Sequence, residues 1–428
     1  MSDETAMAPP GPRGPENRPA LIAWCIYDWA NSAFPTVILT FVFAAYFTQA
    51  VAESAVAGTA MWGQAMAVSG LAIALFSPVL GAIADQGGRR KPSLAVCTAL
   101  CVAAMASLWF VRPDPDDALL AVVLVIIGNV AFEFGIVFYN AMLPDLANPE
   151  RLGRWSGWAW GLGYGGGLAC LVIALVLFVR ADPPPFGLDK TAAEHVRVVA
   201  PLVAIWFAVF AIPLFIATPD TPSRGLGLKA VGAGLRQLVR TLRDLRRHAN
   251  TARYLAAHMI YTDGLNTLFA FGGIYAAGTF GMDITEVMMF GIALNVTAGL
   301  GAFAFGWIDD WIGPKRTISI ALLMLALTGT ALLVVESKAV FWALGLALGA
   351  FFGPAQAGSR SLMARLAPPD MRTEMFGLYS LSGKATAFVG PALLAWVATV
   401  TDSQRLGMAT VVVFLVAGLA LLLTVREP

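Results

Sequence analysis

Charge is scarce in this sequence. Only 13% of its 428 residues are charged, whereas a soluble domain usually carries about 25%. Hydrophobic residues make up 58%, so the chain has too little polar surface to cover soluble domains, and we expect a membrane protein. Its net charge of +1 does not supply the concentrated basic field that a nucleic-acid partner requires, so no such partner is expected.

Motifs of catalysis and metal binding are also missing. The chain has three histidines and four cysteines, and the cysteines lie in apolar segments outside any CxxC pair. It contains no G-x-x-x-x-G-K-[ST], H-E-x-x-H or G-x-S-x-G motif. We therefore expect no metal, no cofactor and no enzymatic activity. Without a nucleotide-binding loop, any transport would be secondary transport.

Long apolar runs are what the sequence does contain. A bilayer core needs about 20 apolar residues per helix, and backbone polar groups inside hydrocarbon must be satisfied within the segment, so runs of this length should be helices. Twelve runs qualify: 20–48, 61–84, 92–111, 118–142, 155–179, 198–217, 254–280, 286–308, 317–335, 339–363, 374–399 and 404–425. The predicted fold class is an all-α integral membrane protein with twelve transmembrane helices.

The positions of Lys and Arg predict the orientation. With both termini in the cytoplasm, twenty of the 28 basic residues lie on the cytoplasmic side and six lie in outer loops, as the positive-inside rule requires. Residues 1–18 are rich in Pro, Gly and charge and have no apolar h-region, which predicts a disordered cytoplasmic tail and no cleavable signal peptide. We expect a multi-pass protein of the bacterial inner (plasma) membrane, acting as a monomer in contact with the lipid bilayer.

The longest cytoplasmic loop, 218–253, carries Leu and Val at three- and four-residue steps with arginines between them. This pattern predicts an amphipathic helix on the anionic inner leaflet, or a mechanical tie between the flanking segments. The chain would then consist of the tail, a six-helix half at 19–217, this linker, and a second six-helix half at 254–428.

An internal repeat supports the two halves. Residues 28–34 (DWANSAF) match 263–269 (DGLNTLF), and 81–91 (GAIADQGGRRK) match 306–316 (GWIDDWIGPKR). A third match joins the LANP sequence before the fifth run to the LAPP sequence before the eleventh. The matches occur in the same order, and both halves begin on the cytoplasmic side. They therefore predict parallel repeats related by an axis along the membrane normal.

These motifs resemble the major facilitator superfamily, whose signature between helices 2 and 3 is similar to GAIADQGGRRK. Within it, YDWANSAF, YTDGLNTLF and the run from residue 351 to 391 resemble the autophagy-linked vacuole effluxer family. The resemblance covers essentially the whole chain. It implies the twelve-helix fold and solute transport, and it points to release of amino acids, with which fungal members are associated.

Charged groups within membrane segments are costly and mark candidate sites. Asp28 and Asp263 lie near mid-membrane at matching positions, and each is followed three residues later by an asparagine, Asn31 or Asn266, on the same helix face. Such faces could bind a solute's ammonium or hydroxyl groups or take up a proton. By symmetry the two aspartates would face each other. The alternative is that both only hydrogen-bond neighbouring helices.

The remaining candidates break the repeat. Glu133 corresponds to a glycine and Lys384 to a tyrosine in the other half, which favours a directional or substrate-specific role. Glu133 is the best candidate for proton coupling, and its alternative is a static ion pair with Lys384 or Arg360. Arg360 lies nearer the cytoplasmic end and could join an inner gate, and Gln356 could line the cavity. The sequence does not choose among these pairings.

Charged residues of the repeated loops lie at the predicted cytoplasmic surface, where opposite charges could bridge the halves when that side is closed. The predicted gate consists of Asp85, Arg89, Arg90, Asp310, Lys315 and Arg316. The alternative role for the basic ones is to set topology.

The predicted function is secondary transport of a small polar solute, such as an amino acid, by alternating access. Efflux and proton coupling are expected. The alternatives are a non-transporting receptor or scaffold with the same fold, and a transporter of a lipid, sugar or drug-like solute.

Overall fold

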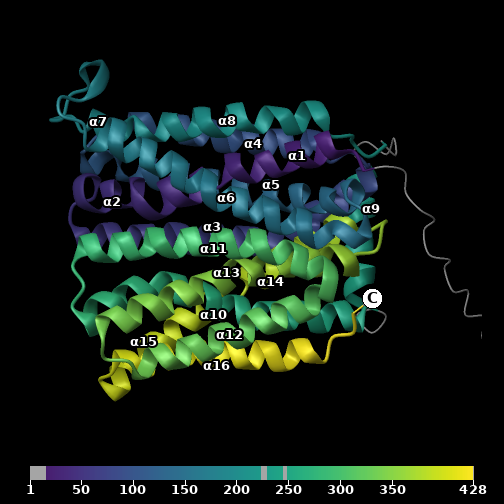
Figure 1. The fold of residues 1–428 in the computed structure, drawn as a ribbon. Coiled ribbons are helices and arrows are strands. Elements are labelled where there is room, and N and C mark those ends of the chain that lie inside the picture. The colour runs from purple at the N-terminus through teal and green to yellow at the C-terminus, as the bar shows by residue number, and fades with distance from the viewer. Residues whose placement is uncertain (1–15, 223–228, 244–247, 428) are drawn as a thin grey trace, which may run out of the picture.

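The computed structural model describes residues 16–222, 229–243 and 248–427, and these residues form helices and no strand. The helices lie side by side in one bundle (Figure 1). The predicted tail up to residue 15 and the linker residues 223–228 and 244–247 lie outside the described residues. The all-α fold class is confirmed.

The first part of the chain is called the N-terminal set. It contains the long helices α1 (Arg18–Asn31), α3 (Ala55–Gly87), α4 (Lys91–Ser107), α5 (Ala118–Leu146), α6 (Leu152–Ala174) and α8 (Val199–Ala217). Shorter elements extend or join them: η1 (Phe34–Phe41), α2 (Phe43–Tyr46), η2 (Phe47–Val51), η3 (Leu108–Phe110), η4 (Pro115–Asp117), η5 (Pro149–Arg151), η6 (Leu175–Val179), η7 (Pro185–Gly187) and α7 (Glu194–Arg197).

The second part is called the C-terminal set. Its helices are α10 (Ala249–Phe280), α11 (Ile284–Ile312), α12 (Pro314–Val334), α13 (Lys338–Leu366), α14 (Arg372–Lys384), α15 (Val389–Thr401) and α16 (Gln404–Leu423). Between the sets, the predicted linker helix is present as α9 (Lys229–Arg243).

Eleven helical segments of the described chain are long and apolar enough to cross a membrane. The twelfth predicted run forms α10, which has 32 residues but does not meet the same requirement for apolar residues. The reason is the number of polar side chains that α10 buries inside the protein, among them Tyr254, His258 and Asp263. A helix can bury such groups against other helices rather than expose them to lipid. That α10 crosses the membrane stays a prediction.

Two predicted helices are interrupted near candidate residues. The first run continues from α1 into the π-helix η1, just after Asn31. The eleventh is broken at residues 385–388, directly after Lys384. Pro391 accounts for the second break, because proline cannot donate to the carbonyl four residues earlier and its ring crowds that carbonyl. Interruptions of this kind often occur at functional sites.

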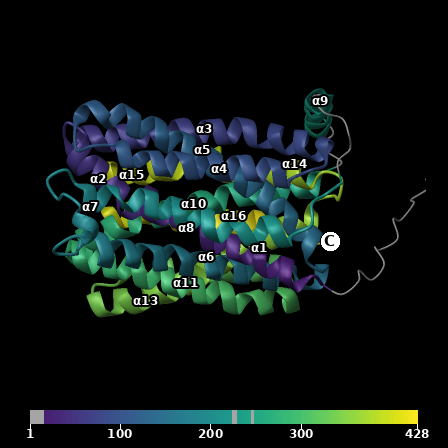
Figure 2. The same ribbon diagram turned by 90° about the horizontal axis from the view of Figure 1, so that it is seen from above.

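The start of α1 and the end of α16 lie at the same end of the bundle (Figure 1), which we call the terminal end. The two sets meet there along α3 with α14 and α6 with α11. Glycines allow the close approach: a Cβ on Gly377 would clash with the backbone of α3 at Ser77, and one on Gly157 would clash with α11 at Ala302. Helix α9 lies across this end beside α3, seen end-on in Figure 2.

Candidate functional site

A cavity of about 440 Å³ lies between the two sets, and we call it the central cavity. Its wall includes all of the predicted solute and proton residues except one: Asp28, Asn31, Glu133, Asn266, Gln356, Arg360 and Lys384. The exception is Asp263. The sequence therefore located most of the charged and amide groups of this cavity, and the structure adds how they are paired.

Arg360 of α13 inserts into the N-terminal set. Its Nη1 lies 2.8 Å from Oδ2 of Asp28 in α1, at a place where both side chains are almost completely buried. Arg360 also donates through Nε to the hydroxyl of Ser156 at 3.0 Å and through Nη2 to the Ser156 carbonyl at 2.7 Å. A buried charge needs this combination of a counter-ion and further hydrogen bonds to be tolerated.

Aromatic rings enclose the same guanidinium. Its carbon lies 4.8 Å from the ring centre of Trp24 and 5.6 Å from that of Trp160, within the range of cation–π attraction. Trp24 stacks on Tyr139 at 4.5 Å, and each ring's polar group donates to the other residue's carbonyl. These rings hold Arg360 in one position, so the Arg360–Asp28 ion pair is built as an anchor between the sets.

A second ion pair joins the sets at the cavity wall. Lys384 Nζ of α14 lies 2.7 Å from Oε1 of Glu133 in α5. The lysine side chain is 35% exposed and the glutamate side chain 16% exposed, so both reach the cavity. Of the two alternatives left open for Glu133, the structure has the pair with Lys384. Because this pair borders open space, a charged solute can approach both members.

The expectation that Asp28 and Asp263 face each other across the cavity is not met. Asp263 is buried and points toward Thr386 and the backbone of Gly390, in and just after the break between α14 and α15. Its Oδ1 accepts no hydrogen bond from the described residues. The repeat preserves the position of the aspartate along the helix, but an arginine from the opposite set, Arg360, pairs only with Asp28.

The amide residues line the cavity in different ways. Asn31 donates to Asp28 at 3.4 Å, and Gln356 accepts a hydrogen bond from the Tyr164 hydroxyl at 2.6 Å across the two sets. Asn266 lines the wall on α10. Sequence reasoning missed several groups of the site, among them His258, which shares a 2.7 Å hydrogen bond with Ser382, and Ser156, whose contact with Arg360 is described above. Buried position, rather than any motif, makes them part of the site.

The predicted gate is only partly assembled at the terminal end. Asp85 accepts hydrogen bonds from the backbone N–H groups of Thr373 and Glu374 at 3.1 and 2.8 Å, at the N-terminus of α14, where a carboxylate is favoured. Arg90 contacts Asp85 at 3.5 Å and also pairs with Asp145. Burial lowers the pKa of Arg90, and Asp85 opposes that shift. Asp145 in turn pairs with Arg372 of the C-terminal set.

The second copy of the repeated loop, residues 306–316, also contacts the opposite set, but through different residues. Asp310 accepts from the backbone N–H of Arg154 at 3.0 Å, and its carboxylate lies 3.3 Å from that side chain. Lys315 instead donates to carbonyls of the C-terminal segment at Leu423 and Val425. Arg89 and Arg316 are exposed. Three of the six predicted gate residues bridge the sets: Asp85, Asp310 and Arg90, whose Nε donates to the Thr373 hydroxyl at 2.8 Å.

Solved structures with the same architecture identify the class of fold. The proton:xylose symporter XylE superposes with a TM-score of 0.74 at 14% identity, covering 96% of each chain. The human organic anion transporter MFSD10 gives 0.70 at 17% identity, covering 95% of this chain and all of that one. FucP in its outward conformation gives 0.66 at 14% identity, over 96% and 99%. The chain is thus a multi-pass membrane protein with the major facilitator fold.

Sequence comparison places it within that superfamily. Residues 53–428 match the family described as "Vacuole effluxer Atg22 like", and the chain belongs to this family of transporters. It is 26% identical over 408 residues to the uncharacterized MFS-type transporter YxiO of Bacillus subtilis, covering 95% of this chain and 94% of YxiO. It is 22% identical to autophagy-related protein 22 of Coccidioides immitis, covering 76% of this chain and 64% of that longer protein.

Proposed function

We propose that this protein is a secondary transporter that carries a small zwitterionic solute, such as an amino acid, by alternating access. The observation that carries the proposal is the Glu133–Lys384 pair, which joins the two sets at the wall of the central cavity. A solute with one ammonium and one carboxylate group can replace the partner of each residue. Binding would then exchange one ion pair for two, and it would replace the direct bridge between the sets with one that passes through the solute.

The direction and the coupling ion are part of the same proposal. The terminal end is closed by close backbone contacts and by the ion pairs Arg154–Asp310 and Arg372–Asp145 between the sets, and we assign this end to the cytoplasm. We also assign the protein twelve membrane helices, a monomeric state and a place in the bacterial inner membrane. Loading from the cytoplasm and release outside would constitute efflux. Glu133, once separated from Lys384, is the group that we assign to proton uptake.

The test is solute movement in liposomes that contain the purified protein. Labelled amino acids, sugars and short peptides are supplied with and without a pH gradient, and wild-type protein is compared with Glu133→Gln. We expect an amino acid to move, faster with the gradient, and the gradient response to vanish in the variant. A receptor or scaffold would move none of them, and a sugar transporter would move only sugars. Either result would refute the proposed solute class.

A further inference from the structure

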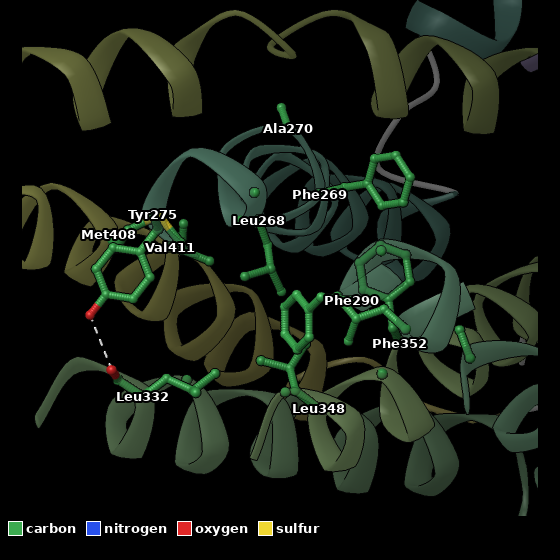
Figure 3. A pocket seen from close by; sticks show the side chains of 18 of the residues that line it. Leu268, Phe269, Ala270, Tyr275, Phe290, Leu332, Leu348, Phe352, Met408 and Val411 are labelled. Carbon is green, nitrogen blue, oxygen red and sulfur yellow. Dashed lines mark hydrogen bonds between the residues drawn. The ribbon is translucent and has the colours of Figure 1, made fainter. Parts of the chain in front are cut away.

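A second cavity, of about 390 Å³, lies among the helices of the C-terminal set (Figure 3). We call it the apolar cavity. Its wall is formed mainly by α10, α11, α12, α13 and α16, and the side chains that point into it in Figure 3 include Leu268, Phe290, Leu348 and Met408. Hydrocarbon thus lines nearly the whole surface, in contrast to the charged wall of the central cavity.

Three of the few polar side chains of this wall already donate to backbone carbonyls of the protein. The Tyr275 hydroxyl donates to the Leu332 carbonyl at 3.1 Å, drawn as a dashed line in Figure 3. The Asn295 amide donates to the Gly291 carbonyl at 2.8 Å, and the Thr40 hydroxyl donates to the Pro35 carbonyl at 2.9 Å. A polar group of a ligand would lose its hydration there without a comparable partner. The cavity is therefore suited to hydrocarbon.

The two cavities adjoin. Six residues line both of them: Thr40, Phe41, Tyr164, Phe269, Asn295 and Phe352. Phe269 and Phe352 come from different helices, with ring centres 6.2 Å apart, and they form an apolar boundary between the spaces. A ligand with a charged group in the central cavity can thus extend past these rings into the apolar cavity.

The volume limits what the hydrocarbon part can be. An apolar cavity of about 150 Å³ is sufficient to bind benzene, and this one holds about 390 Å³. The ring of an aromatic amino acid would leave more than half of it empty, and unfilled apolar space forfeits dispersion contacts. A flexible chain of many methylenes fills such a space better.

We propose that the apolar cavity binds the hydrocarbon chain of an amphiphile whose zwitterionic head lies between Glu133 and Lys384. The inference rests on the proposed function and narrows its solute from a small zwitterion to one that carries a long alkyl or acyl chain. Head and chain would contact both sets together, since the head lies between the sets and the chain lies within the C-terminal one.

Two glycines offer a way to fill the apolar cavity without a clash. Gly291 of α11 and Gly272 of α10 both line it, and a Cβ added to either meets no heavy atom within 4 Å. Leucine at these positions would therefore occupy cavity space. Gly70 of α3 is the matched control, because a Cβ there also meets nothing within 4 Å and Gly70 is not among the residues that line either cavity.

The experiment uses a dodecyl betaine with a diazirine at the end of its chain as probe. Full-length protein in lipid nanodiscs is illuminated with the probe, and the labelled peptides are identified by mass spectrometry. We expect labels on the walls of the apolar cavity, and a loss of about tenfold or more in Gly291→Leu and Gly272→Leu but not in Gly70→Leu. Unlabelled dodecyl betaine should protect the cavity from labelling. The butyl analogue should protect far less, because its shorter chain has fewer methylenes to bury in the apolar cavity.

Several outcomes would overturn the inference. These are labelling elsewhere, equal protection by the butyl analogue, or equal labelling by a phosphatidylcholine with the same diazirine, which would indicate an ordinary bilayer chain. Unchanged labelling in both leucine variants would do the same, provided that their melting temperatures match that of Gly70→Leu. Failure of the proposed function would give a different result. Liposomes that move no solute would refute transport even if the probe labels the apolar cavity. Transport of short amino acids without labelling would refute only the binding of a hydrocarbon chain in the apolar cavity.

Discussion

At the scale of single residues, the two ion pairs between the sets differ in exposure. The Arg360 side chain is 4% exposed and that of Asp28 is 10% exposed, against 35% for Lys384 and 16% for Glu133. Removing one member of a buried pair leaves an uncompensated charge in a medium that solvates it poorly, whereas a pair beside an open cavity can be hydrated. The first pair therefore holds the structure, and the second is available for exchange with a solute.

This difference predicts unequal effects on stability. Arg360→Met should lower the free energy of unfolding by about 3–5 kcal/mol, since it strands Asp28 in a buried site. Lys384→Met should lower it by about 0–1 kcal/mol, since Glu133 can be hydrated. Both substitutions remove one cation from the same set of helices, so each serves as the control for the other. Thermal unfolding of the purified variants in one detergent would measure the difference. Equal losses would contradict the assignment of an anchor and an exchangeable pair.

The exchangeable pair also gives a prediction for transport. The swapped variant Glu133→Lys with Lys384→Glu keeps an ion pair between α5 and α14, so we expect its melting temperature to stay near that of the wild type. Its solute flux should fall by about tenfold or more, because the head of the solute would meet its charges in reversed positions. Liposome uptake measures the flux. Wild-type flux in the swapped variant would show that the pair serves only to hold the helices together.

At the scale of elements, apolar runs predicted the helices well and their interruptions poorly. Eleven of the predicted runs appear among the segments able to cross a membrane, and the twelfth forms α10. The runs at 20–48 and 374–399 were each predicted as one helix, whereas both are interrupted after a candidate residue. Pro35 and Pro391 were the available signals. A count of hydrophobic residues does not register a missing backbone donor.

Helix α9 shows a second limit of the sequence pattern, which predicted the helix but not its contacts. Its leucines and arginines predicted an amphipathic helix on the membrane surface, but the pattern could not name the protein surface that it covers. Gly234 lies against the backbone of α3 at Ile83, and Gln237 contacts Gln86 of α3 and donates to Glu374 of α14 at 2.7 Å. Contacts between elements distant in sequence have no local signature. This helix touches both sets at their terminal end.

Gln237→Ala should therefore favour opening of the terminal end, because it removes a link from α9 to both sets. Spin labels at the exposed positions Arg89→Cys and Arg316→Cys, one on each set, would report the opening by pulsed electron resonance. We expect the population with a long distance to grow by about tenfold or more, because a hydrogen bond to a carboxylate, such as the one from Gln237 to Glu374, contributes about 1.5–3 kcal/mol. Arg236→Ala, on the exposed face of α9, is the control and should leave the distances unchanged. An unchanged distribution in both variants would remove α9 from the gate.

At the scale of the whole molecule, the repeat predicted where the two sets would correspond but not where they would differ. It placed Asp28 and Asp263 at equivalent positions, yet Arg360 pairs with the first, whereas the second points toward Thr386 and the backbone of Gly390. Glu133 and Lys384, which the repeat marks as unequal, form the pair at the cavity wall. A repeat fixes positions along helices, whereas pairing depends on the rotation and register of helices that meet across the axis. Candidate residues were thus predictable, and their partners were not.

The same axis determines how the molecule can move, because the contacts at the terminal end must separate for that end to open. Gly377 of α14 lies against the backbone of α3 at Ser77 and Pro78, so a larger side chain there is incompatible with closure. Gly377→Leu should shift the protein toward the state that is open at the terminal end, with longer distances between labels at Arg89→Cys and Arg316→Cys and a strongly reduced transport rate. Gly70→Leu adds the same side chain to open space and should change neither. If Gly377→Leu keeps the short distances and the wild-type rate, the closed end seen here is not one of the two states of the transport cycle.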